Sequence, residues 1–182
     1  MVVLDLLEKG ADADKLAEKM SPMDIFLNYD TLISHGAKNI DITKIALKMP
    51  DGYFVWVHLE EFAKYGADVD RLADELFSVL FIDDAEKLLK NGASIAQVFN
   101  MSDEMLLLNT NNPEGLLEIF TLFHQYGMSE EYIRAWFTTY ADYKVLEDIV
   151  NNGAKWKHLG AFPGDFLNKY LAWREYFRNS PS

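Results

Sequence analysis

Leu88-Leu89-Lys90-Asn91-Gly92-Ala93 combines two apolar residues, two polar residues, a glycine and a small residue. Five related stretches occur along the 182-residue chain, and successive glycines are 26 to 35 residues apart. The six glycines are Gly10, Gly36, Gly66, Gly92, Gly127 and Gly153. A pattern that returns at this period is typical of stacked supersecondary units rather than of one irregular globule.

Each of these glycines is expected to end a helix, because a residue without a Cβ adopts the left-handed conformation of a helix C-terminus at little steric cost. Four positions before each glycine stands an apolar residue, expected to face inward from the last turn: Leu6, Leu32, Phe62, Leu88, Phe123 and Ile149. After the glycine comes a residue of a type that caps helix N-termini. These residues are Asp12, Asp41, Asp68, Ser94 and Ser129. Each unit is therefore predicted as helix, glycine, short link and helix.

The expected fold is all-α, a right-handed stack of about six helical hairpins of the α-solenoid type. Helices are expected at residues 2–9, 13–20, 22–35, 41–48, 52–65, 69–80, 83–91, 95–100, 102–108, 113–126, 130–140, 142–152, 155–160 and 164–178. One stretch allows an alternative, because residues 53–57 are β-branched and aromatic and by themselves resemble a strand. A helix is preferred there, since Val55, Leu59 and Phe62 continue a helical stripe into Gly66.

The chain is predicted to form a single helical-repeat domain over residues 1–182. Residues 109–113 are polar and turn-rich and end in proline, which is typical of a linker. The pattern also takes its longest step there, 35 residues. A sub-boundary at 109–113 is the alternative to a longer loop within one stack.

Leu88-Leu89-Lys90-Asn91-Gly92-Ala93 and the stretch from Leu6 to Asp12 resemble the end of the outer helix in ankyrin repeats, which closes with an LLxxGAD-like string. The TPLHxA-like helix start of ankyrin repeats is missing, and a helix follows Gly-Ala almost at once. The chain is therefore similar to an α-helical hairpin solenoid with ankyrin-like helix ends, not to a true ankyrin array. That resemblance implies protein recognition on a concave surface.

The charge of the chain is strongly acidic and unevenly spread. Its 29 acidic and 17 basic residues give a net charge of -12, and 49% of its residues are hydrophobic, which is enough for a packed core. Residues 1–132 hold 24 acids and 10 bases, whereas residues 133–182 hold 5 acids and 7 bases. This balance disfavours direct nucleic-acid binding. It suits a basic partner, or serves solubility alone.

Two groups of residues are candidates for binding a partner. The acidic candidates in the first part of the chain are Asp12, Asp14, Asp68, Asp70, Asp83 and Asp84. The candidates in the last fifty residues are Trp136, Trp173 and Arg174, because tryptophan and arginine are enriched at interface hot spots. The alternative for both groups is structural: solvated or capping acids, and aromatic residues in a core.

No motif in the sequence indicates catalysis, a cofactor or a metal site. Cysteine is absent, no glycine-rich phosphate loop or nucleophile elbow occurs, and the four histidines lie in different units. His124 is expected to be a hydrogen-bonded core residue. The N-terminal residues do not have the composition of a signal peptide, and no apolar run is long enough for a membrane span. A cytoplasmic protein is expected.

Three functions are compatible with these observations. The preferred one is a non-enzymatic protein-interaction module whose acidic surface binds a basic partner. The first alternative is a small inhibitor whose acidic face mimics nucleic acid and blocks a nuclease, since phage anti-defence and anti-CRISPR proteins are similar in size and charge. The second alternative is an enzyme with a site assembled between repeats, around His124 or His158.

Overall fold

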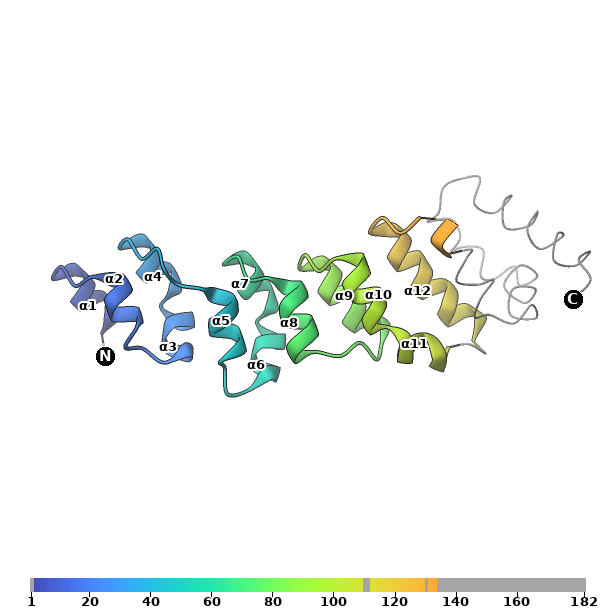
Figure 1. Cartoon of the computed structure of the whole chain (residues 1–182), viewed down its shortest axis with the longest axis horizontal. Coiled ribbons are helices and arrows are strands. Elements are labelled where there is room, and N and C mark those ends of the chain that lie inside the picture. Colours follow the sequence, from blue (N-terminus) through green and yellow to red (C-terminus); the bar gives the residue numbers. More distant parts are fainter. Residues whose placement is uncertain (1, 110–111, 130, 134–182) are drawn as a thin grey trace, which may run out of the picture. The chain divides into compact units, whose positions relative to one another are not determined.

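The computed structural model describes residues 2–109, 112–129 and 131–133. The regular elements within these ranges are α-helices, which confirms the all-α prediction (Figure 1). They are α1 (Val3–Glu8), α2 (Ala13–Ala17), α3 (Pro22–Leu27), α4 (Tyr29–Ser34), α5 (Ile42–Leu47), α6 (Gly52–Val57), α7 (Leu59–Lys64), α8 (Val69–Leu76), α9 (Ile82–Lys90), α10 (Ile95–Met101), α11 (Asp103–Leu108) and α12 (Pro113–Gln125). Residues 131–133 are helical as well. The rest of the helices expected from residue 130 onward lies outside the described residues.

The chain divides into two compact units. Unit 1 comprises Met1–Phe77 and Asn91–Ala93, and it contains α1 to α8. Unit 2 comprises Ser78–Lys90 and the described residues from Ser94 onward, with α9 to α12. The single-domain organisation with a sub-boundary at 109–113 stays a prediction.

The helix ends follow the predicted glycine pattern. Gly10, Gly36, Gly66, Gly92 and Gly127 have φ between +92° and +106°, while Gly153 lies outside the described residues. At Gly66 the backbone N–H donates to the Ala63 carbonyl (3.0 Å), and the next N–H, that of Ala67, donates to the Phe62 carbonyl (2.9 Å). These two bonds define a Schellman motif, and the same pair closes the helices at Gly10, Gly36 and Gly127. The apolar residue four positions before the glycine therefore supplies the carbonyl that this motif needs.

That apolar residue is fully buried at Leu32, Phe62, Leu88 and Phe123. The inward position predicted for Leu6 is wrong, because its side chain is 38% exposed. In that first copy the neighbouring Leu7 is buried instead, in a cluster with Val3, Ala13, Ala17, Ile25, Leu32 and Ala37.

The predicted N-caps are confirmed. The side chains of Asp12, Asp41, Asp68 and Ser94 accept a hydrogen bond from the backbone N–H three residues later, at the starts of α2, α5, α8 and α10. Ser129 does the same for the N–H of Tyr132. Proline stands in the first turn of α3 and of α12, as expected for a residue without an N–H to satisfy.

The expected helix at 13–20 ends early, at Ala17, and three others differ from the observed ones by a break or by an early end. Residues 22–35 and 52–65 each form two helices, because the chain leaves helical angles at Asn28 (φ -113°, ψ 16°) and at His58 (φ -101°, ψ 21°). The Asn28 side-chain amide donates to the Asp24 carbonyl and so competes for a helical acceptor. The helix expected at 69–80 ends at Leu76, where Phe77 becomes extended.

The strand alternative for residues 53–57 is wrong. These residues lie in α6, where the Asp51 side chain accepts the N–H of Tyr53 and Val55 is fully buried. The aromatic and β-branched residues are therefore accommodated in a helix, with Val55 buried and Tyr53 and Val57 exposed.

Within unit 1, helices contact neighbours that are close along the chain. The contacts join α2 with α4, α3 with α4 and α5, α5 with α7 and α8, and α6 with α7. Val55, Leu59, Phe62 and Leu72 are fully buried among them. The core of unit 1 is thus built from one stripe of each helix.

Unit 2 has its own core. Helix α9 contacts α10 and α12, and α10 contacts α11. Leu88, Val98, Leu116, Phe120 and Phe123 are fully buried. Ser102, also buried, satisfies its hydroxyl by donating to the Val98 carbonyl at 2.6 Å.

Candidate interaction surface

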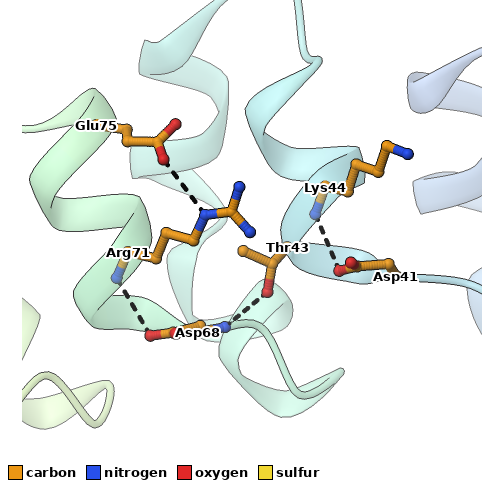
Figure 2. Close-up of polar contacts among 6 residues, drawn as sticks. All are labelled: Asp41, Thr43, Lys44, Asp68, Arg71 and Glu75. Carbon is orange, nitrogen blue, oxygen red and sulfur yellow. Dashed lines mark hydrogen bonds and ion pairs between the residues drawn. The ribbon is translucent and has the colours of Figure 1, made fainter.

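Two of the acidic candidates cap helices. The Asp12 carboxylate accepts the N–H of Lys15 at 3.1 Å, and that of Asp68 accepts the N–H of Arg71 at 3.2 Å. Figure 2 shows the capping bond of Asp68 and that of Asp41, which caps α5 in the same way. These donors are neutral, so capping leaves the negative charge of each aspartate in place at an exposed edge.

Asp14 connects successive hairpins of unit 1. Its Oδ1 accepts the backbone N–H groups of Lys38 and Asn39, both at 2.9 Å. At the next hairpin, the Thr43 hydroxyl accepts the backbone N–H of Asp68 at 2.8 Å (Figure 2). Asp14 and Thr43 stand two residues after their N-caps, and both reach the loop that follows the next Schellman glycine. The same contact therefore recurs at two consecutive hairpins.

The other candidate binding residues are the acids of α8 and α9 and three residues near the C-terminus. Asp84 accepts the N–H groups of Leu80 and Phe81 at 3.1 and 3.0 Å, and so holds the loop before α9. Asp83 is exposed in the first turn of α9, and Asp70 lies in the first turn of α8. The candidates Trp136, Trp173 and Arg174 lie outside the described residues.

Many acids in the structure have neutral partners. Asp24 and Asp30 accept hydroxyl groups, from Ser21 (2.9 Å) and Tyr65 (3.2 Å) respectively. Glu61, Glu75 and Glu86 instead pair with a basic residue: His58, Arg71 and Lys90. The contacts of Asp24 and Asp30 thus hold their carboxylates without cancelling their charge.

Basic residues are missing from two long stretches of unit 1. Residues 21–37 and 49–63 contain no lysine or arginine, yet they hold five acids: Asp24, Asp30, Asp51, Glu60 and Glu61. These stretches form α3, α4, α6 and most of α7. The lysines of this unit lie on other segments, such as Lys44 and Lys48 of the α5 region. This segregation was visible in the sequence as two ranges without lysine or arginine. It was missed because acidic and basic residues were counted over the whole of residues 1–132.

An aromatic cluster joins the two base-free stretches. The Phe26 ring of α3 stacks on Phe62 of α7 (centroids 4.4 Å apart) and meets Phe54 of α6 edge-on (5.4 Å). Tyr29 and Tyr65 also stack, at 4.2 Å. Helices α3 and α4 are therefore packed against α6 and α7 through rings, an arrangement that contributes about 0.5–1.5 kcal/mol per aromatic pair beyond area burial.

The tyrosines of this cluster respond to the local negative charge. Burial first, and then the Asp30 carboxylate, raise the pKa of Tyr65 above its usual value. The Tyr65 hydroxyl also donates to Asp30, a bond that is lost when the phenol ionises. The pKa of Tyr29 is raised by burial and by Asp30 as well.

Large apolar side chains lie exposed on the same helices. Leu27 at the end of α3 is 68% exposed, and Tyr53 and Val57 of α6 are 71% and 49% exposed. Asp24 lies three residues before Leu27, Asp51 caps α6 beside Tyr53, and Glu60 lies three residues after Val57. We call Leu27, Tyr53 and Val57, with Asp24, Asp51 and Glu60, the α3–α6 surface. Sequence reasoning did not identify it.

A groove of about 410 Å³ lies between α2, α3 and α5. Ala17, Ile25 and Ile45 contribute apolar lining, and Glu18, Lys44 and Lys48 contribute charged lining. Acids and bases therefore meet in this groove, in contrast to the uniformly acidic α3–α6 surface.

The structure also describes His124 and the remaining histidines and acids of the described ranges. His124 Nδ1 lies 2.9 Å from the Met128 carbonyl oxygen and the ring is partly buried, which agrees with the predicted structural role. Within residues 2–109, 112–129 and 131–133, no three histidine, aspartate or glutamate side chains gather as metal ligands would. The helices of the same ranges include none with the length and apolarity to cross a bilayer.

The chain was compared with protein families, curated proteins and solved structures. No protein-family model, no curated protein and no solved structure matches the chain significantly.

Proposed function

We propose that this chain is a protein-interaction module, an α-solenoid-like stack of about six helical hairpins whose acidic surface binds a basic partner. The recurrence of one contact at two hairpins supports the stack. Asp14 holds the loop after Gly36, and Thr43 holds the loop after Gly66, each from the same position of its own hairpin. A repeat that meets its neighbour in the same way each time is what a solenoid requires.

The observation that supports binding through an acidic surface is that many aspartates accept hydrogen bonds from uncharged donors. Asp12, Asp14, Asp41, Asp51 and Asp68 accept backbone N–H groups, so their carboxylates are held in place while still charged. Charges that are already oriented attract an oppositely charged partner without a further ordering cost. Such a surface accelerates association with a basic partner and repels acidic ones.

Salt dependence tests this function. The Debye length falls from about 10 Å at 0.1 M ionic strength to about 3 Å at 1 M, so attraction between exposed charges is lost over this range. The tagged chain is used as bait in affinity capture from the native host, and retained proteins are identified by mass spectrometry after washing at each ionic strength. We expect basic proteins that are retained at low salt and released at high salt. Partners whose retention is indifferent to salt would count against an acidic interaction surface.

A charge variant sharpens the same experiment. Glu60→Gln and Asp83→Asn each remove one exposed acid, and the capping bonds described above do not involve either residue. We expect the combined variant to release its partners at lower salt than the wild-type chain does. Lys9→Gln is the matched control, because it removes an exposed charge of the opposite sign and should shift release to higher salt.

A further inference from the structure

The exposed apolar side chains of unit 1 occupy equivalent positions in two hairpins. Leu27 lies nine residues before Gly36, and Val57 lies nine residues before Gly66. The corresponding residues before Gly92 and Gly127 are Asp83 and Glu118. The same count gives Met1 before Gly10 and Lys144 before Gly153. Between Gly36 and Gly127 this position is therefore apolar in the two copies that form the α3–α6 surface and acidic in the two that follow.

Ring contacts of the residues next to these in the sequence join the two helices. The Phe26 ring, next to Leu27, meets the rings of Phe54 and His58, which are next to Tyr53 and Val57. Tyr53 and Val57 are one turn apart and share a face of α6. Exposed apolar side chains on contacting helices, with acids close to them in the sequence, are typical of binding surfaces.

We infer that the α3–α6 surface binds a basic amphipathic helix of a partner protein, an inference that rests on the proposed function and deepens it. The apolar stripe of the partner helix lies on Leu27, Tyr53 and Val57, and its lysines or arginines face the flanking acids Asp24, Asp51 and Glu60.

The charge of the surface selects this partner over others. A second copy of the chain carries the same net charge of -12 and would bring acids against acids. Anionic lipid headgroups and nucleic-acid phosphates are repelled in the same way. A basic protein segment is the partner whose charge is complementary to all three flanking carboxylates.

The backbone of the surface selects a helix over an extended segment. Helices satisfy their backbone hydrogen bonds internally, and α3 and α6 therefore offer no strand edge for an extended peptide to join. Recognition must use side chains. Apolar side chains one turn apart match the spacing of an amphipathic helix.

Fluorescence anisotropy with a defined peptide tests this inference. The probe is a fluorescein-labelled helix, Lys-Leu-Lys-Lys-Leu-Leu-Lys-Lys-Leu-Lys-Lys-Leu, whose leucines form one stripe. A scrambled peptide of the same composition has no stripe, and a third peptide carries glutamate in place of lysine. We expect the wild-type chain to bind the striped basic peptide more tightly than the scrambled one, and not to bind the acidic one.

Two triple variants of unchanged charge locate the binding. The first variant combines Leu27→Ser, Tyr53→Ser and Val57→Ser. It should lower the affinity for the striped peptide at least about tenfold, the scale expected when anchoring side chains are removed. The control is Phe81→Ser with Leu107→Ser and Leu108→Ser, which changes three side chains that are 69% to 70% exposed in unit 2. It should leave the affinity unchanged, and the circular dichroism spectra of both variants should match that of the wild type.

The outcomes separate the inference from the function on which it rests. If the striped peptide binds but the unit 1 variant retains its affinity, or the scrambled peptide binds equally well, the α3–α6 inference is overturned while an acidic interaction surface stands. If no basic peptide binds and affinity capture yields no salt-sensitive partner, the proposed function fails as well.

Discussion

Replacing Gly66 by alanine tests the role of the recurring glycine. Gly66 has φ +94°, and an added Cβ would meet no atom within 4 Å, so crowding by neighbours contributes nothing to the effect. The cost comes only from the backbone conformation, in which a Cβ approaches the following carbonyl oxygen. That conformation costs an L-residue roughly 1–2 kcal/mol, and we expect this loss in the free energy of unfolding.

Gly52→Ala is the matched control. Gly52 is the first residue of α6, its φ is not positive, and a Cβ there also meets no atom within 4 Å. Alanine reduces the conformational entropy of the unfolded chain, so this variant should gain about 0.4–1 kcal/mol. The same chemical change is thus expected to have opposite signs at two glycines 14 residues apart.

Urea denaturation followed by circular dichroism measures both effects. The midpoints should rank Gly52→Ala above wild type and wild type above Gly66→Ala, with Gly66→Asn between the last two because asparagine tolerates positive φ. In thermal melts each kcal/mol corresponds to about 2–4 °C for a chain of this size. A Gly66→Ala variant as stable as wild type would refute the assignment of this glycine as a Schellman cap.

Three further predictions concern the hydrogen bonds within unit 1. Thr43→Val removes the acceptor of the Asp68 N–H, and urea denaturation should show a loss of about 1–3 kcal/mol, whereas Thr43→Ser should keep most of the stability. Asp41→Ala removes the cap of α5 and should cost about 1 kcal/mol in the same assay, and Asp41→Ser should recover most of it. Tyr65 should ionise at higher pH than a free tyrosine; because its folded pKa is raised, its contribution to stability is present below pH 10.0 and is lost as pH rises through the folded pKa. Asp30→Asn should lower that pKa, which absorbance titration of tyrosinate would detect.

Much of the fold was predictable because its signals are local. A positive φ is tolerated best by glycine and an N-cap requires a short polar side chain, so Gly36 and Asp41 mark their helix ends whatever packs around them. The breaks at Asn28 and His58 have no comparable signal in the sequence. Asparagine and histidine also occur in the interior of helices, so neither residue type marks a helix end. The strand-like residues 53–57 show the same limit, since their β-branched and aromatic side chains are typical of a strand, yet the Asp51 cap begins a helix there.

Of the candidate surface, only the sign of its charge was predictable from the sequence. The sequence indicates an acidic chain, but a carboxylate that caps a helix and one that faces a partner belong to the same residue type. Asp12 and Asp68 have capping bonds, and Asp14 holds a loop, although the pattern of charge alone suggested a binding role for all three. Leu27 and Val57 were missed because an apolar residue in a helix is normally assigned to the core.

Helical periodicity explains why those apolar residues are outside. Asn28 and His58 both lie eight residues before the glycine that closes their hairpin's first segment, and each directly follows an exposed apolar residue, Leu27 or Val57. A helix turns successive side chains by about 100°, so residues seven apart share a face and residues two apart face opposite sides. Ile25 and Leu32 are seven residues apart and both buried, as are Val55 and Phe62, so the inward stripe continues across each break. Leu27 and Val57 lie two residues after Ile25 and Val55 and therefore point away from that stripe. Two consecutive hairpins thus expose an apolar group at the same place, close in sequence to acids that a basic helix can reach.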